Sequence, residues 1–346
     1  MLLEWFRLNG RDLPWRGTKD PYKIWVSEII LQQTQVVQGR AYYERFINAL
    51  PDVKALASVS DDSLLVLWQG LGYYSRAHNL KYSAQLIMER YAGVFPNTVD
   101  GVASLKGVGP YTTAAIMSIA YDYPLAVVDG NVYRVLSRLM GSEHPIDTVP
   151  GRRYYADLAN LLLDPNFPSH YNQAMMDLGA LVCTPRNPSC EDCPVCSLCQ
   201  SRGTTLVNLL PRKEKRTQVA ERYLYFYLYI HDGRFAVERR GKSGIWKGLY
   251  QLPLDVSESP KTLPMCLKDW TVVDEIILPD HRLSHRLLHI KVYICNQKED
   301  AVNDKSCDYD WVKVSEHQDL AFPKPLRAFL DQYFSASSLP LFCSTP

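Results

Sequence analysis

A cluster of cysteines in the middle of the chain constrains the fold more than any other feature. Four of them follow the pattern Cys183-x6-Cys190-x2-Cys193-x5-Cys199. The chain opens with Met1-Leu2-Leu3-Glu4-Trp5, which lacks the basic and apolar regions of a secretory leader, so we expect a reducing, cytoplasmic setting. Clustered thiols in such a setting usually hold a metal, here an iron–sulfur cube or a structural zinc.

The cysteine spacing favours the iron–sulfur group. Zinc sites usually combine two short cysteine pairs, which the six-residue gap after Cys183 fits poorly. A fifth cysteine, Cys196, makes the cysteine spacing between Cys190 and Cys199 similar to that of the ferredoxin motif. Ferredoxins, however, have a wider spacing before their last cysteine and a proline after it, whereas Gln200 follows Cys199 here. We predict one [4Fe-4S] cluster whose ligands are Cys183, Cys190, Cys193 and Cys199, and we expect that Cys196 is not a ligand.

Length and charge bound the remaining possibilities. A chain of 346 residues is long enough for two domains. The formal net charge is +1, so a polyanionic partner must be met by local basic patches. The longest apolar stretch, Ile116–Val128, is interrupted by Asp122 and Pro124, and we expect no membrane association.

The hydrophobic period changes along the chain. Residues 1–200 show helical spacing, and a stretch with several basic residues at 201–221 reads as an interdomain linker that either contacts phosphate or is merely solvated. Residues 222–346 alternate with a period of two. Two strands are predicted on either side of a turn at His231-Asp232-Gly233, at Tyr223–Ile230 and Phe235–Val237. Two later strands are predicted at Ile290–Cys295 and Trp311–Val314, and a closing helix at Pro325–Phe334. The predicted fold is an all-α domain followed by a smaller α+β domain.

A glycine turn separates two helical patterns at Leu105–Tyr111. Its residues Gly107, Val108 and Gly109 can turn tightly and present backbone N–H groups at the start of the next helix, which suits a phosphate. Any helix–turn–helix also needs such a turn.

Two carboxylates stand out near helical segments. Asp129 precedes a helical pattern that runs to Met140, where it is either an ordinary N-cap or a carboxylate kept ionised by the helix dipole. Glu28 shares an apolar stripe of a helix with Ile24 and Leu31. Loss of solvation there should raise the pKa of Glu28; the alternative is that Glu28 is a buried, hydrogen-bonded structural residue. One protonated and one ionised carboxyl group are typical of glycoside-type chemistry.

The hairpin, the aspartate and the cysteine loop together resemble the helix–hairpin–helix DNA glycosylases of the endonuclease III superfamily. Three further segments resemble MutY-type adenine DNA glycosylases, and they are Leu13–Arg16, Trp25–Val36 and Gly70–Arg76. The resemblance implies a helical subdomain at 21–130 and a cluster subdomain formed by 1–20 and 131–200.

The resemblance also implies roles for individual residues. Glu28 protonates adenine and Asp129 supports the oxocarbenium ion, with Tyr111 and Asn131 beside them. The adenine pocket is expected to be lined by Trp15, Arg16, Leu31 and Gln173. The duplex contacts are expected from Gln33, Tyr73, Tyr74, Gly107, Val108 and Gly109. Gln33 with Tyr73 or Tyr74 should fill the gap, because base extrusion requires side chains that replace lost stacking; the alternative for the tyrosine pair is packing at a helix end.

Tyr111 separates this chain from its bifunctional relatives. They carry a lysine at this place, whose amine attacks the sugar and leads to strand cleavage. A phenol cannot do this, so we expect base removal without strand cleavage. Thymine-type mismatch glycosylases also have tyrosine here and are the closest enzymatic alternative, ahead of a bifunctional endonuclease III-like enzyme, but they lack a second domain.

The second domain resembles the MutT-like (Nudix) domain of the same family. Trp246–Pro253 matches its signature, but the glutamate-rich magnesium helix is missing, so recognition without hydrolysis is expected. A Phe-Ser-His loop inspects 8-oxoguanine in that family, and the matching residues here are Leu283, Ser284 and His285. Leucine in place of the aromatic departs from the pattern. The alternative is a general phosphate-contacting patch formed by the nearby residues His281, Arg282, Arg286 and His289.

These observations predict a monofunctional glycosylase that excises adenine opposite 8-oxoguanine or guanine in double-stranded DNA. We expect a monomer in the cytoplasm, associated with the nucleoid in a bacterium. A non-enzymatic alternative is an iron–sulfur DNA-binding module, which gives no reason for Glu28 and Asp129 to accompany the hairpin.

Overall fold

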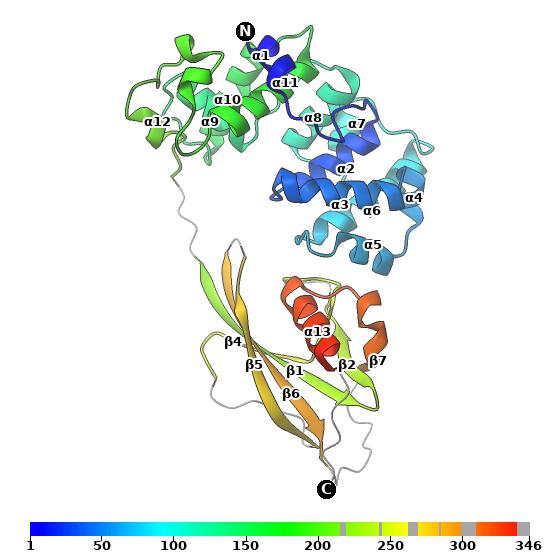
Figure 1. Ribbon diagram of the computed structural model, residues 1–346. Coiled ribbons are helices and arrows are strands. Elements are labelled where there is room, and N and C mark those ends of the chain that lie inside the picture. The colour runs from blue at the N-terminus through cyan, green and yellow to red at the C-terminus, as the bar shows by residue number, and fades with distance from the viewer. Residues whose placement is uncertain (215–218, 242–243, 262–268, 284, 299–308, 338–346) are drawn as a thin grey trace. The chain divides into compact units, whose positions relative to one another are not determined.

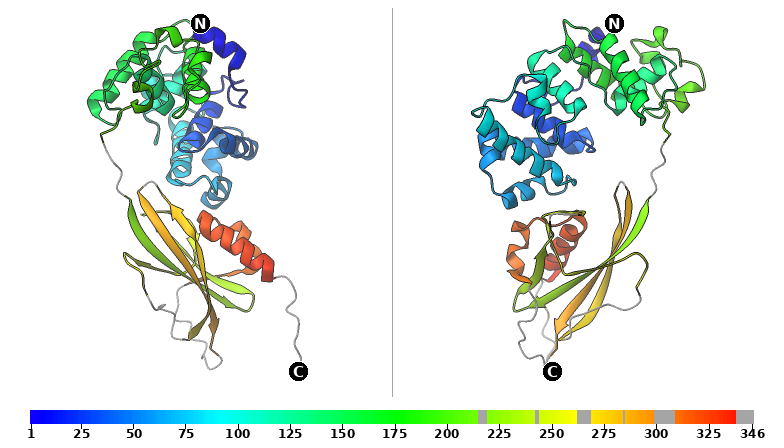
Figure 2. Two further views of the ribbon diagram at one scale, coloured as in Figure 1. Left: turned by 60° about the vertical axis from the view of Figure 1, so that its left-hand side comes forward. Right: turned by 180° about the vertical axis from the view of Figure 1, so that it is seen from behind.

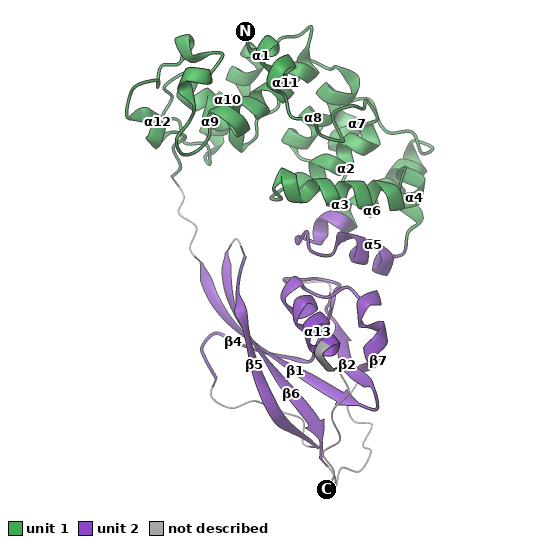
Figure 3. Ribbon diagram, viewed as in Figure 1, with its two compact units in different colours: residues 1–59, 78–216 green, residues 60–77, 217–346 purple. Residues whose placement is uncertain are grey.

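The computed structural model describes residues 1–214, 219–241, 244–261, 269–283, 285–298 and 309–337 (Figure 1). Its internal contacts group the chain into two compact units (Figure 3). The first comprises Met1–Val59 and His78–Arg216, and the second comprises Ser60–Ala77 and Thr217–Pro346. The predicted domain boundaries kept 60–77 with the helical part, and they stay a prediction.

The N-terminal two thirds of the chain is helical, as predicted. Its α-helices are α1 Leu2–Asn9, α2 Pro21–Leu31, α3 Val36–Ala49, α4 Val53–Ser58, α5 Asp61–Trp68, α6 Ser75–Arg90, α7 Val99–Ala103, α8 Pro110–Tyr121, α9 Gly130–Leu139, α10 Val149–Leu162, α11 Pro168–Asp177 and α12 Leu206–Leu209. A π-helix, η1 Leu178–Val182, continues α11, and two 3₁₀ turns lie in the cysteine loop at η2 Cys190–Asp192 and η3 Cys196–Leu198.

Helix α2 is the central element of the first unit. Asp20 caps its N-terminus by accepting from the Tyr22 N–H, and Pro21 occupies the first turn, where a missing N–H costs nothing. Every residue from Ile24 to Ile30 is buried, which is why the apolar pattern wraps almost fully around this helix. Helix α8 packs against α2, and α11 packs against α8, α1 and α9.

The second unit contains a seven-stranded sheet within the described residues. The strands are β1 Ala220–His231, β2 Arg234–Arg239, β3 Tyr250–Gln251, β4 Leu254–Ser257, β5 Trp270–Arg282, β6 Arg286–Gln297 and β7 Asp310–Lys313. The main path of the sheet has the order β3-β2-β1-β6-β5, with β4 paired to β1 and β7 paired to β2. Strands β1 and β6 are parallel, and β5 and β6 form a long antiparallel hairpin.

Helix α13 (Lys324–Ser337) covers one face of this sheet (Figures 1 and 2). Its apolar side chains join Phe226, Phe235 and Val292 in a buried core. The opposite face is unusually rich in tyrosine, with Tyr225, Tyr227, Tyr229 and Tyr293 buried against one another. Burying such rings stabilises the domain by apolar contact and by their stacked geometry.

The predicted fold class is confirmed. The four predicted strands of the second domain correspond to β1, β2, β6 and β7, with the last residue of the fourth in a 3₁₀ turn, η4 Val314–Asp319, and the predicted closing helix lies within α13. Strand β5 was not predicted, because its exposed and partly buried positions carry both polar and apolar residues. Among the described residues, no helix combines the length and the apolar character needed to cross a bilayer.

Candidate active site

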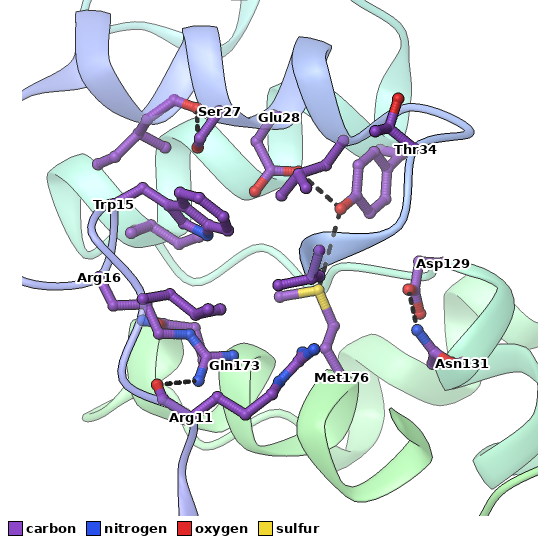
Figure 4. A pocket seen from close by; sticks show the side chains of 16 residues that line it. Arg11, Trp15, Arg16, Ser27, Glu28, Thr34, Asp129, Asn131, Gln173 and Met176 are labelled. Atoms are coloured by element: carbon purple, nitrogen blue, oxygen red, sulfur yellow. Dashed lines mark hydrogen bonds between the residues drawn. The ribbon is translucent and has the colours of Figure 1, made fainter. Parts of the chain in front are cut away.

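A cavity of about 190 Å³ opens in the first unit where α2, α8, α11 and the segment before α2 meet (Figure 4). Five residues expected at the reaction centre or the base pocket line it, namely Trp15, Arg16, Leu31, Tyr111 and Gln173. Both candidate catalytic carboxylates, Glu28 and Asp129, line it too, and so does Asn131. The cavity also has lining residues that sequence reasoning did not single out, which include Arg11, Ser27, Thr34 and Met176.

Glu28 is buried on α2, with 6% of its surface exposed. Burial raises the pKa of Glu28 to about 7, because a charged carboxylate loses its hydration there. The hydrogen bond from Tyr111 and the charge of Arg16 oppose this rise, while the Asp129 carboxylate adds to it. The carboxyl group can therefore exchange a proton near neutral pH.

Tyr111 lies in the first turn of α8 and faces Glu28. Its hydroxyl donates to Glu28 Oε2 at 2.6 Å and lies 3.9 Å from Met176 Sδ. Burial raises the pKa of Tyr111 well above its usual value, so the phenol stays protonated and acts as a donor. Among the described residues, none of those lining the cavity is a lysine.

Asp129 is the N-cap of α9, as the sequence pattern predicts. Its Oδ1 accepts from the Val132 N–H at 2.7 Å, and its Oδ2 accepts from Asn131 Nδ2 at 2.8 Å. Burial nevertheless raises the pKa of Asp129, and the hydrogen bonds from Val132 and Asn131 and the charge of Arg134 oppose that rise. The carboxylate is thus held in one orientation at the cavity wall.

The remaining predicted pocket residues form the walls of the cavity. Trp15 is buried and contacts Tyr43 edge to face, with ring centroids 5.2 Å apart. Gln173 is anchored through its Nε2, which donates to Ser169 Oγ at 3.1 Å. Arg16 forms two hydrogen bonds to the Asp177 carboxylate. Asp177 was missed in the sequence, where it stands unremarked between apolar neighbours.

The predicted hairpin joins α7 to α8. Gly107 adopts φ +83°, and a Cβ there would lie 2.9 Å from Asn79 Nδ2, so a side chain would be strained and crowded. The backbone N–H of Lys106 donates to Ser83 Oγ at 2.8 Å, which fixes the turn to α6. Gly109 is the N-cap of α8, so free N–H groups at this helix start are available to an anion.

Two segments expected to contact DNA carry strained backbone. Gln33 follows α2 with φ +58° and is exposed, and Tyr73 has φ +46° and is 47% exposed. Tyr74 is buried, so only Tyr73 of the pair presents its ring to solvent. The Tyr73 turn is held by Arg76, which donates to the carbonyls of Leu71 and Gly72. Strain of this kind is common where a side chain must be aimed at a ligand.

The cysteine loop surrounds a small pocket of about 30 Å³ in the first unit. All five thiols line it, so the loop brings Cys183 close to partners from both 3₁₀ turns. Arg138 lies beside it, with Nη1 3.4 Å from Cys183 Sγ, and Arg202 also lines it. Within the part of the chain that the structure describes, no group of three or more His, Cys, Asp or Glu side chains is arranged to hold a metal.

A hydrogen-bonded path joins the cavity to the cysteine loop. Asn131 Nδ2 donates to Asp129, and Asn131 Oδ1 accepts from Arg134 Nη2 at 2.9 Å. Arg134 also donates to the Gly179 carbonyl at 2.6 Å and, through Nε, to the Cys183 carbonyl at 2.7 Å. Arg134 lies in the helical pattern that follows Asp129, but only the fold reveals that it contacts both sites.

In the second unit, the loop predicted to inspect the lesion lies at the tip of the β5–β6 hairpin. Leu283 packs against the domain core and donates its N–H to the Arg286 carbonyl at 2.8 Å, and His285 is exposed. Ser284 lies outside the described residues. Trp246, from the predicted signature segment, lies near this hairpin with its ring centroid 6.0 Å from that of His281.

Two domain families match the chain. Residues 26–149 match the HhH-GPD superfamily of base excision DNA repair proteins, and residues 224–332 match the NUDIX domain. The first match runs through 60–77. Among solved structures, a thermostable thymine-DNA glycosylase is 30% identical with a TM-score of 0.54, covering 58% of this chain and 92% of that one. A trapped endonuclease III–DNA intermediate is 21% identical with a TM-score of 0.50, over the same shares, which supports the fold alone.

Curated relatives extend over both units. The adenine DNA glycosylase of Buchnera aphidicola from Schizaphis graminum is 32% identical and aligns with 96% of this chain and 97% of its own length. The human adenine DNA glycosylase is 43% identical over 58% of this chain and 38% of its own. Because the first of these relatives aligns over nearly the full length of both chains, the resemblance covers both units of this chain. The chain belongs to the adenine DNA glycosylase family.

Proposed function

We propose that this protein is a monofunctional glycosylase that hydrolyses the N-glycosidic bond of adenine in duplex DNA. The observation that carries the proposal is Glu28, a carboxyl group that faces the cavity from a buried helix and has a pKa of about 7. A group with such a pKa is half protonated near neutrality and can act as a general acid. The chain belongs to a family of adenine DNA glycosylases, and this chemistry agrees with that family.

The reaction follows from the groups around the cavity. Glu28 donates its proton to a ring nitrogen of the extruded adenine, and the bond from C1′ to the base breaks with its electron pair leaving on the base. The positive charge that develops on the sugar is stabilised by Asp129, which Asn131 and the start of α9 hold in place. Water then adds to C1′ and gives up a proton to a carboxylate.

The strand remains intact in this proposal, because none of the described residues that line the cavity carries an amine. Tyr111 occupies the place where a lysine would be needed to form a Schiff base with the opened sugar. Its raised pKa makes the phenol a poor nucleophile, and its hydrogen bond to Glu28 gives it another use as a donor. The product is an abasic site.

A [4Fe-4S] cluster is the cofactor we propose for the cysteine loop, held by Cys183, Cys190, Cys193 and Cys199. The chemistry of the donor set fits such a group, because five thiols line one small pocket, although the side chains in the described structure are not arranged as metal ligands. The cluster would supply a rigid cross-link for the loop when bound. Arg134 and Asn131 would then transmit the position of the Cys183 backbone to Asp129.

The partner is double-stranded DNA in which adenine lies opposite 8-oxoguanine or guanine. The N–H groups at the start of α8 suit a phosphate, and Gln33 and Tyr73 are exposed side chains suited to filling the space that an extruded base leaves. We propose that a monomer acts on this DNA in the cytoplasm, at the nucleoid in a bacterium.

The β5–β6 tip is the proposed reader of the opposite base. An 8-oxoguanine differs from guanine by an added O8 and a protonated N7, which an imidazole such as His285 can sense by hydrogen bonding. Leu283 is partly buried against the domain core, and its side chain has no ring with which to stack. Discrimination therefore rests on polar contacts, with His285 and Ser284 as the candidates.

The test measures released adenine and strand integrity on duplexes with adenine opposite 8-oxoguanine, guanine or thymine, and on a duplex with thymine opposite guanine. The proposal requires adenine release with an intact strand, fastest opposite 8-oxoguanine. Release of thymine instead would favour the thymine-type alternative. Replacing His285 and Ser284 by alanine should slow release opposite 8-oxoguanine more than opposite guanine, and an unchanged ratio would remove the lesion-reading role.

A further inference from the structure

Asp177 is the most heavily paired carboxylate next to the cavity. It ends α11 and its side chain is fully buried. Arg16 donates to it through Nη1 at 2.6 Å and Nη2 at 2.7 Å, and Arg11 donates through its backbone N–H at 2.9 Å and Nε at 2.7 Å. These bonds hold the pKa of Asp177 below its usual value despite its burial. The carboxylate is therefore a fixed anion that binds two arginines at once.

The segment that Asp177 holds forms one wall of the cavity. Residues 10–20 contain no helix or strand, yet Arg11, Leu13, Trp15 and Arg16 all line the cavity. Arg16 Nη1 also donates to the Arg11 carbonyl at 2.9 Å, which closes the segment on itself. A loop without regular backbone hydrogen bonds keeps one shape only if other contacts impose it, and Asp177 accepts four hydrogen bonds from Arg11 and Arg16 of this loop.

Asp177 also balances charge near Glu28. The charged and titratable groups that face Glu28 are Tyr111 from α8, Asp129 at the start of α9 and Arg16 from the loop. Arg16 and Arg11 bring two positive charges to this wall, and Asp177 offsets one of them. Changing Asp177 therefore alters both the position and the field of Arg16.

We propose that Asp177 is a positioning residue for base excision, which fixes the loop of Arg11, Trp15 and Arg16 as a preformed wall against the extruded base. This inference rests on the proposed function and deepens it. Preformed walls matter because a displacement of about 1 Å at a reacting group can cost about 100-fold in rate. Asp177 acts through Arg16 and Trp15 and does not line the cavity itself.

The test compares Asp177→Asn with the matched control Asp122→Asn. Asp122 pairs at 2.8 Å with Lys19 near the end of the same loop, but both side chains are more than half exposed. Single-turnover adenine release should fall by a factor on the order of 100 in Asp177→Asn and should be unchanged in Asp122→Asn. Binding should stay within a few-fold of native on a duplex whose target carries a 2′-fluoro substituent, which destabilises the sugar cation and blocks cleavage.

A pH profile separates positioning from a purely structural loss. Asp177→Asn leaves the charges of Arg11 and Arg16 unbalanced, which favours ionised Glu28, so the pKa of Glu28 falls and the rate declines from a lower pH. Asp177→Glu keeps the anion but lengthens the side chain, so the native pH midpoint should return while the rate recovers only in part. An Asp177→Asn enzyme with native rate and native midpoint overturns the proposal.

If Asp177→Asn does not fold, the double variant Asp177→Asn with Arg11→Gln takes its place, since it removes one charge of each sign. It should show the native pH midpoint with a slowed rate, and a native rate would contradict positioning by Asp177. The outcomes also separate the two proposals. Failure of the unaltered protein to release adenine refutes the proposed function, whereas full activity of the Asp177 variants refutes only this inference.

Discussion

The Tyr111 hydroxyl donates a hydrogen bond of 2.6 Å to Glu28 Oε2. Because a donor stabilises the ionised carboxylate, this contact lowers the pKa of Glu28, while burial raises it. The balance leaves a pKa of about 7 for Glu28. In the proposed reaction, Tyr111 therefore lowers the pKa of the acid, and by the family resemblance it stands where bifunctional enzymes are expected to carry a lysine.

The first prediction concerns this hydrogen bond. Tyr111→Phe removes the donor, so the pKa of Glu28 should rise and adenine release should persist to higher pH than in the native enzyme. The measurement is the pH dependence of the single-turnover rate. Tyr121→Phe is the matched control on α8, because the Tyr121 hydroxyl donates to the Phe95 carbonyl at 3.4 Å rather than to Glu28, so its loss should leave the profile unchanged. A Tyr111→Phe midpoint at lower pH would show that the hydroxyl does not stabilise ionised Glu28.

The second prediction concerns Asp129. Asp129→Asn removes the charge but preserves the cap, since asparagine caps helices as well as aspartate does. Excision should be lost while the melting temperature and duplex affinity stay close to native, because affinity depends mainly on phosphate contacts. Rate, melting temperature and salt-dependent binding are measured together. An Asp129→Asn enzyme that still releases adenine at near-native rate would show that the carboxylate charge is not needed.

The third prediction converts the enzyme type. Tyr111→Lys places an amine in a buried site, where burial lowers the pKa of a lysine and leaves it partly neutral and nucleophilic. The variant should cleave strands and form an adduct that borohydride traps, whereas the native protein should show little of either. Tyr121→Lys, about three helical turns further along α8, is the control for a lysine elsewhere. Strong trapping with the native protein would contradict monofunctional chemistry.

The fourth prediction concerns the cysteine loop. The purified protein should contain iron and absorb broadly in the visible region, as iron–sulfur clusters do. Cys183→Ser should lose iron and loosen the loop, whereas Cys196→Ser should retain it. Iron analysis on anaerobically prepared protein decides this. Zinc without iron, or iron loss in Cys196→Ser alone, would require another cofactor or another set of ligands.

The sequence was sufficient for the elements with strong local signals. The buried stripe of α2, the capping Asp129 and the hairpin glycines each obey a local rule, so their placement follows from periodicity, caps and turn chemistry. The strands β1 and β6 were equally clear, because their apolar and aromatic runs are long.

The contacts between distant segments could not be read from the sequence. Asp177 pairs with residues more than 160 positions away, and Arg134 bridges Asn131 to the Cys183 backbone. No local pattern marks such partners, since an aspartate at a helix end and an arginine within a helix are ordinary residues. The pKa of Asp129 was also beyond local reasoning, because its burial outweighs the hydrogen bonds and the helix dipole that favour its ionised form.

The central claim, that protonated Glu28 is the acid, is tested most directly by the native pH–rate profile. Single-turnover adenine release at saturating enzyme is measured between about pH 5 and pH 9, alongside Glu28→Gln. Because only the protonated form donates, the native rate should be highest below the Glu28 pKa of about 7 and fall as the pH rises through it. Glu28→Gln should be inactive at every pH. A native rate that stays constant or increases through this range would contradict the account.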